Sequence, residues 1–170
     1  MDHCINGRSL FPATGHLYTA WQVIGLDKIV QFNSFEICQA IVLDVISEPK
    51  VAFNVIVAEN KITIMNKSLV VARMNFKIVN HFPIMATDNG TDNEINFVDI
   101  YNEFNRYGYE YKEEFKLIQS KNSKIGHLSA TPHIIAYMDC VLQMCLDNIT
   151  GLLLPTLLRK VISFVHFSVW

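Results

Sequence analysis

Apolar side chains recur at helical intervals in one stretch near the start of the chain. In PATGHLYTAWQVIG, residues 12–25, Leu17, Trp21 and Ile24 keep the spacing of one helix face. Pro12 suits the first helical turn, where its missing N–H would have no partner inside the helix. The other faces are apolar as well, so we expect a buried helix.

A long region dense in Val, Ile, Phe and Thr follows this helix, and these residue types favour strands. We expect a hairpin turn at AENKIT and a loop at SEPK, where polar turn residues interrupt the apolar pattern. The first half is therefore predicted to hold one buried helix followed by several antiparallel strands. The predicted strand-rich stretches are 29–44, 50–60 and 61–79.

The second half has a similar content in a different order. Segment 86–96 is rich in Gly, Thr, Asn and Asp, which predicts a linker. Beyond it we expect a short amphipathic helix in 97–111, a strand and hairpin in 113–129, a long buried helix in 132–151 and one or two strands in 152–165. The prediction is an α+β fold of two units, 1–85 and 97–170, which suggests an internal duplication.

The composition excludes several classes of protein. Hydrophobic residues make up 51% and charged residues 18% of the chain, so it is not disordered. The formal net charge is −2 and Lys and Arg are not clustered, so we expect no nucleic-acid partner. No apolar run reaches the roughly 18 residues of a membrane span. Pro155, Arg159 and Lys160 interrupt the best candidate, 152–170.

The cysteines and the N-terminus predict a cytoplasmic protein. There is no basic segment followed by an apolar one at the start, so we expect no signal peptide. No two cysteines form a C-x-x-C pair, and we interpret all four as reduced thiols. A zinc site formed by Cys140, Cys145 and a histidine would have the wrong ligand spacing, so no metal is expected. The four cysteines are Cys4, Cys38, Cys140 and Cys145.

The first candidate chemistry lies directly ahead of the first helix. His3, Gly7 and Pro12 form the pattern H-x-x-x-G-x-x-x-x-P. The backbone N–H groups before a helix attract negative charge, and a glycine lets a ligand carbonyl approach the backbone closely. A histidine beside such a loop suits proton abstraction next to a carbonyl. The alternative is a structural histidine, which is the commoner role.

The second candidate is a carboxyl group on the long helix of the second half. Asp139 and Gln143 lie four residues apart, on one helix face. Apolar residues surround Asp139 in the sequence, and burial would raise the pKa of its carboxyl group. It could then donate a proton near neutral pH, with Gln143 holding its orientation. The alternative is an Asp at the solvated edge of the helix, bonded to Gln143 for structure alone.

Four segments together resemble the product-template-like dehydratase domain of animal fatty acid synthase and of the related polyketide synthases. DHCINGRSLFPATGHLYTAW contains that family's H-x-x-x-G-x-x-x-x-P motif, and AYMDCVLQM is similar to its D-x-x-x-Q motif. GLLLPTLLRKV resembles the family segment LPTRIRKV, and RYGYEYKEEF resembles the tyrosine-rich segment between the motifs. Their order and spacing fit over nearly the whole chain. The residues of YGYEYKEEF and IAYMDCVLQM are most similar to those of insect fatty acid synthases.

The resemblance implies a double hot-dog fold, in which each of two long buried helices is wrapped by an antiparallel sheet. It implies dehydration of a (3R)-3-hydroxyacyl thioester to the trans-2-enoyl thioester, in fatty acid or polyketide synthesis. The substrate would be carried on the phosphopantetheine of acyl carrier protein. That protein and the other fatty acid synthase domains would be partners, no metal or organic cofactor would be needed, and a homodimer is left open.

The resemblance also implies a role for each candidate residue. His3 would remove the C2 proton, Asp139 would protonate the leaving hydroxyl group, and Gln143 would support Asp139. An amide of the loop from Gly7 to Pro12 would bind the thioester carbonyl, with Gly7 the first choice. Tyr111 matches a family tyrosine near the site.

The chain departs from the family pattern at several positions. Tyr111 is followed by Lys-Glu where the family often has Gly-Pro, His16 stands where a tyrosine is usual, and Leu157 replaces a usual arginine. The chain starts two residues before His3, and the family pattern ends near Val161. We therefore expect a truncated chain whose second hot-dog unit is incomplete.

Two further functions remain as alternatives at this point. One is a catalytically inactive hot-dog fragment that acts as an acyl-binding or interaction module. The other is thioester hydrolysis, against which the pair of motifs argues. The sequence does not reveal the acyl chain length, the oligomeric state, or the choice between fatty acid and polyketide synthesis.

Overall fold

The computed structural model describes residues 2–43, 50–80, 95–122, 126–146, 151–152, 154 and 156–163. These residues form two compact units that are not consecutive in the chain. Unit 1 comprises Met1–Thr14, Val42–Pro49 and Met85–Leu154, and unit 2 comprises Gly15–Ile41, Lys50–Ile84 and Pro155–Trp170. None of the described helices is long and apolar enough to cross a membrane.

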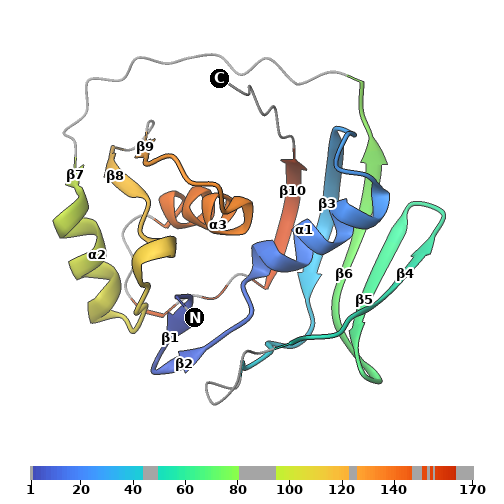
Figure 1. Ribbon diagram of the computed structural model, residues 1–170, viewed down its shortest axis with the longest axis horizontal. Helices are drawn as coiled ribbons and strands as arrows, with labels where there is room; N and C mark the ends of the chain where they lie inside the picture. The colour runs from blue at the N-terminus through green and yellow to red at the C-terminus, as the bar shows by residue number, and fades with distance from the viewer. Residues whose placement is uncertain are drawn as a thin grey trace. The chain divides into compact units, whose positions relative to one another are not determined.

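Unit 2 is built around an antiparallel sheet of five strands, in the order β10-β3-β6-β5-β4 (Figure 1). Val30, Phe32 and Ile64 in this sheet and Trp21 in helix α1 are almost fully buried, and a side chain of this size contributes about 1.5–3 kcal/mol when buried. The elements are α1 (Ala13–Ile24), β3 (Val30–Ile37), β4 (Asn54–Ala58), β5 (Lys61–Asn66), β6 (Leu69–Ile78) and β10 (Leu157–Ser163).

The predicted first helix and strands are confirmed in this unit. α1 begins one residue after Pro12, and the AENKIT turn joins β4 to β5. β10 is a strand, as predicted, but it pairs with β3, placing Val161 opposite Phe32. Strand β10 therefore belongs to unit 2, whereas the prediction placed all of 97–170 in one unit. Two strands pair where their edges are complementary, whatever their order in the chain. The SEPK loop lies mostly outside the described residues.

Unit 1 combines a small hairpin, two helices and a three-stranded antiparallel sheet in the order β7-β8-β9 (Figure 1). The predicted helix, strand and hairpin after the linker are all confirmed. The linker 86–96 lies outside the described residues except for its last two, which form β7. The elements are β1 (Cys4–Ile5), β2 (Arg8–Ser9), β7 (Ile95–Asn96), α2 (Phe97–Arg106), the 3₁₀ turn η1 (Glu113–Phe115), β8 (Ile118–Lys121), β9 (Gly126–Leu128) and α3 (Ile134–Met144).

Helix α3 ends at Met144, well before the predicted end at Gly151. The Lys121 ammonium group donates hydrogen bonds to the carbonyl of Leu146 at 2.9 Å and, at 3.5 Å, to that of Met144. A cation at this end satisfies carbonyls that have no partner inside the helix. The predicted extension through 147–150 lies outside the described residues.

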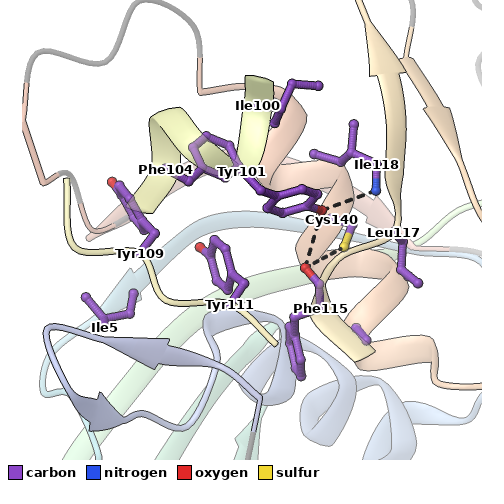
Figure 2. Packing of buried hydrophobic residues seen from close by; sticks show 11 residues of the cluster. Ile5, Ile100, Tyr101, Phe104, Tyr109, Tyr111, Phe115, Leu117, Ile118 and Cys140 are labelled. Atoms are coloured by element: carbon purple, nitrogen blue, oxygen red, sulfur yellow. Dashed lines mark hydrogen bonds between the residues drawn. The ribbon is translucent and has the colours of Figure 1, made fainter. Parts of the chain in front are cut away.

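An aromatic cluster forms the core of unit 1 (Figure 2). Helix α2 contributes its apolar face, and α3 contributes Ala136 and Cys140. The rings of Tyr109 and Tyr111 stack with their centroids 5.9 Å apart. The buried members are Ile5, Ile100, Tyr101, Phe104, Tyr109, Tyr111, Phe115, Leu117, Ile118, Ala136 and Cys140.

Candidate active site

A tight hairpin carries the first candidate residues. β1 and β2 pair antiparallel, and the turn between them has Asn6 at φ 47° and Gly7 at φ 71°. Two successive residues with positive φ are typical of the hairpin turns whose twist matches the strands. The Leu10 N–H donates to the His3 carbonyl at 3.0 Å, which fixes His3 beside the end of this hairpin.

Hydrogen bonding determines the tautomer of His3. Its Nδ1 lies 3.1 Å from the Leu10 carbonyl oxygen, which can only accept. Nδ1 therefore carries the proton, and in the neutral ring Nε2 has a lone pair. The ring packs between Tyr111 and Phe115, with centroids 5.5 Å and 5.4 Å away. The arrangement leaves a base at Nε2, held by a partner on the opposite ring nitrogen.

That base faces the carboxyl group of Asp139 on α3. His3 Nε2 and Asp139 Oδ1 are 3.8 Å apart, which is too long for a hydrogen bond. Asp139 is 5% exposed. The Gln143 amide donates to Oδ2 at 3.0 Å, and the Thr14 hydroxyl lies 3.5 Å from Oδ1. The structure thus brings His3, Asp139 and Gln143 together within unit 1.

Burial raises the pKa of Asp139, because the interior solvates a carboxylate less well than water does. His3, Gln143 and Thr14 act in the opposite direction, since each favours the ionised form, but burial outweighs them. A carboxyl group with a raised pKa can hold its proton nearer neutral pH. The pair therefore combines a base and an acid at one place.

Tyr111 lies in the same cluster of aromatic rings as His3 and is 6% exposed. Burial is the main cause that raises the pKa of its phenol, and the Asp139 charge adds to it, so the hydroxyl group stays protonated. The Lys-Glu pair that follows Tyr111 leads into η1. The ring nevertheless lies beside His3, near the candidate site, as the resemblance implied.

Gly7 has a partner that the sequence did not reveal. Its N–H donates to Glu110 Oε1 at 3.1 Å, and the Cys4 thiol lies 3.6 Å from Oε2 of the same carboxylate. In this conformation the amide predicted to bind a carbonyl is used by Glu110. Pro12 is buried immediately ahead of α1.

The sequence did not predict two residues of this network, Thr14 and Tyr101. The Thr14 hydroxyl also lies 3.2 Å from the carbonyl of Ile135, one turn before Asp139. The Tyr101 hydroxyl on α2 lies 3.3 Å from Gln143 Oε1. Thr14 lies inside the quoted PATG segment, and Tyr101 lies on the apolar face of the predicted amphipathic helix. Both residues lie in segments predicted to be helical, and only the fold reveals their hydrogen bonds.

Metal ligands do not gather in the described part of the chain, which holds no group of three or more His, Cys, Asp or Glu side chains suited to an ion. All four cysteines are unpaired thiols; Cys4 and Cys140 are buried, and Cys38 and Cys145 are exposed. Burial is the main cause that raises the pKa of Cys140 to about 11, which keeps this neighbour of Asp139 uncharged at neutral pH.

No protein-family model matches the chain. Among solved structures, the dehydratase domain from the CurF module of curacin polyketide synthase matches with a TM-score of 0.73 and 20% identity, covering 94% of this chain and 70% of its own. The dehydratase domain of a mycocerosic acid synthase-like polyketide synthase matches with a TM-score of 0.76 and 14% identity, and the match covers 94% of this chain and 68% of that domain. An inactive mutant of the CurK dehydratase matches with a TM-score of 0.73 and 17% identity, and the match covers 96% of this chain and 71% of the mutant chain. The chain therefore has the α+β hot-dog fold of polyketide synthase dehydratase domains.

Proposed function

We propose that this chain dehydrates a (3R)-3-hydroxyacyl thioester to the trans-2-enoyl thioester. The observation that carries the proposal is the pair formed by His3 Nε2 and Asp139 Oδ1, 3.8 Å apart. The Leu10 carbonyl leaves a lone pair on Nε2, and burial favours a proton on Asp139. A base and an acid with these protonation states are what the elimination of water requires.

The reaction needs one proton removed and one supplied. His3 Nε2 takes the C2 proton, the electrons of that bond form the C2–C3 double bond, and the C3–O bond breaks. Asp139 Oδ1 gives its proton to the departing oxygen, which leaves as water. His3 then holds an extra proton and Asp139 lacks one, and passing that proton back restores both. No metal or organic cofactor enters this balance.

The remaining candidate residues have supporting roles in the proposal. Gln143 holds the Asp139 carboxyl group by its bond to Oδ2. Tyr111 shapes the site beside the His3 ring. The Gly7 amide, in the loop that ends at Pro12, binds the thioester carbonyl, and the Glu110 carboxylate must first leave that amide.

The structural neighbours support this chemistry and its setting. They are dehydratase domains of polyketide synthases, and the CurK dehydratase is described as inactive in one form with a histidine replaced by phenylalanine and in another with an aspartate replaced by asparagine. By this analogy, we propose a substrate carried on the phosphopantetheine of acyl carrier protein, in polyketide or fatty acid synthesis. Acyl carrier protein and the other domains of such a synthase are then the partners.

A second candidate is an acyl-binding module without catalysis. The bond between the Gly7 amide and Glu110 favours it, because that bond occupies the group that would stabilise the developing charge on the thioester oxygen. Glu110→Ala distinguishes the two functions. For a dehydratase, releasing the amide lowers KM for the acyl thioester, whereas a module without catalysis gains affinity and still makes no product.

The decisive experiment is a dehydration assay with (3R)-3-hydroxybutyryl-acyl carrier protein. We expect enoyl product from the native chain and a loss of at least about a hundredfold in kcat for His3→Ala and for Asp139→Asn. His127→Ala, at an exposed histidine on β9, is the matched control and keeps the native rate. A folded native chain that gives no product, or product that persists in both variants, contradicts the proposal.

A further inference from the structure

A buried tyrosine lies on the side of Gln143 that faces away from Asp139. The Tyr101 hydroxyl, shown in Figure 2 with its bonds to Phe115 and Ile118, lies 3.3 Å from Gln143 Oε1. It also accepts from the N–H of Ile118 at 3.2 Å and lies 3.5 Å from the carbonyl of Phe115. Tyr101 is 4% exposed, so protein groups supply these partners.

The directions of these bonds follow from the donors and acceptors present. The hydroxyl group has one proton to donate; it accepts from the Ile118 N–H, and the Cys140 thiol is a further neighbour. The Phe115 carbonyl already accepts from Gln143 Nε2 at 3.1 Å and from the Cys140 thiol at 3.4 Å. Of its two oxygen acceptors, Gln143 Oε1 at 3.3 Å is nearer than the Phe115 carbonyl at 3.5 Å, so we assign the proton of Tyr101 to Gln143. Burial raises the pKa of this phenol, so the donor keeps its proton.

These bonds leave one orientation for the Gln143 amide. Its oxygen faces the Tyr101 hydroxyl, and its nitrogen faces two acceptors, the Phe115 carbonyl and Asp139 Oδ2. An amide turned by 180° would place two oxygens against each other at Phe115 and would leave Tyr101 facing another donor. The tyrosine and the carbonyl together exclude that alternative.

The orientation of the amide decides which oxygen of Asp139 carries the acid proton. Oδ2 accepts from Gln143 Nε2 at 3.0 Å, whereas the Thr14 hydroxyl is 3.5 Å from Oδ1 and nearer, at 3.2 Å, to the Ile135 carbonyl, so the proton of the neutral acid resides on Oδ1. Oδ1 is the oxygen that faces His3 Nε2, at 3.8 Å. A turned amide would present its oxygen to Oδ2, and the proton would move there, away from the base.

We propose that Tyr101 is a positioning residue, which fixes the Gln143 amide and thereby keeps the acid proton of Asp139 on the oxygen that faces His3. This inference rests on the dehydratase function proposed above. It assigns to α2 a part in the chemistry, although Tyr101 itself touches neither reacting group.

The kinetic test is Tyr101→Phe, which removes the hydroxyl group and keeps the ring. We expect kcat to fall about tenfold with KM unchanged, as for the loss of a partner that supports a reacting group. Ile100→Val, at a buried residue next to it on α2, is the control for a loss of stability and keeps kcat. In a Gln143→Leu background, Tyr101→Phe should have no further effect. Additive losses, or an unchanged kcat, overturn the proposal.

A titration separates this inference from the proposed function. The ¹³C signal of the Asp139 carboxyl group reports its protonation whether or not the chain turns over substrate. We expect Tyr101→Phe to raise the midpoint, because the carboxylate loses a well-oriented donor, and Ile100→Val to leave it unchanged. An absence of activity would then refute the function alone, whereas an unchanged midpoint in Tyr101→Phe would refute the role of Tyr101.

A second replacement covers the case in which Tyr101→Phe does not fold. 3,5-Difluorotyrosine at position 101 keeps the hydroxyl group and makes it a stronger donor. It should lower the midpoint of the Asp139 titration, the opposite of the expected effect of phenylalanine. A midpoint equal to that of the native chain would overturn the proposal here too.

Discussion

The buried side chain of His16 allows a quantitative test of how much a positive charge in the core of unit 2 lowers the free energy of unfolding. Its side chain is 2% exposed on α1, and the Phe53 ring lies edge-on with its centroid 5.5 Å away. Burial lowers the pKa of His16 from 6.5 to about 4, because the interior solvates the imidazolium ion less well than water does. We therefore expect a neutral ring in the native protein at neutral pH.

The sign of the effect follows from the two pKa values. The unfolded chain binds this proton more tightly than the native state, so the stabilisation is fully present above 6.5 and is lost as the pH falls towards about 4. Each pKa unit corresponds to about 1.4 kcal/mol, so His16 should lower the free energy of unfolding by about 3 kcal/mol across this range. His16→Gln has no ring to titrate, and this part of the loss should disappear.

Urea unfolding at several pH values measures the effect through the fluorescence of Trp21, which is 1% exposed on the same helix. A Trp170→Phe background leaves Trp21 as the one tryptophan. Carboxyl groups also titrate here, so the comparison is the slope of His16→Gln against that of the native chain. His127→Gln, at an exposed histidine, is the control for the histidine-to-glutamine change itself. Equal slopes for native and His16→Gln would refute the reasoning.

Three further changes test other parts of the molecule. Asp139→Asn should raise the free energy of unfolding at neutral pH, because burial raises the pKa of Asp139 and ionising this carboxyl group in the native state costs stability. The gain should vanish when urea unfolding is measured below pH 3.8, the pKa of the carboxyl group in the unfolded chain, because the group is then protonated in both states. Lys121→Met should cost about 1–3 kcal/mol and reduce amide-exchange protection at the end of α3, because Leu146 loses its donor, and unchanged protection would contradict this. Ile64→Ala in the fully buried part of the five-stranded sheet should cost about 2–5 kcal/mol in the same assay, and exposed Ile56→Ala should cost much less.

Local patterns predicted the elements well, because periodicity and turn residues act over short distances. Helix α1 starts beside Pro12, and α2 and the hairpin of β8 and β9 lie where expected. The predicted end of α3 at Gly151 was wrong, and local periodicity does not reveal that Lys121 of β8 donates to the carbonyls of Met144 and Leu146 at this end. The partner of β10 could not be predicted from local patterns either. Its pairing with β3 joins segments more than a hundred residues apart, which no local signal encodes.

The candidate site shows the same division. The motif spacings singled out His3, Asp139 and Gln143, which the structure brings together. Spacing could not reveal that Glu110 binds the Gly7 amide, because that bond spans 103 positions of sequence. Hydrogen-bond direction is also a property of the fold.

The proposed role of Asp139 as an acid rests on its burial. His3, Gln143 and Thr14 would all favour a carboxylate, and His3 has the largest effect of the three although its Nε2 lies 3.8 Å from Oδ1. Gln143 makes the close bond of 3.0 Å to Oδ2, and the Thr14 hydroxyl lies 3.5 Å from Oδ1. Burial outweighs all three, so a change that admits water beside Asp139 would favour the ionised form and deprive the proposed site of its proton donor.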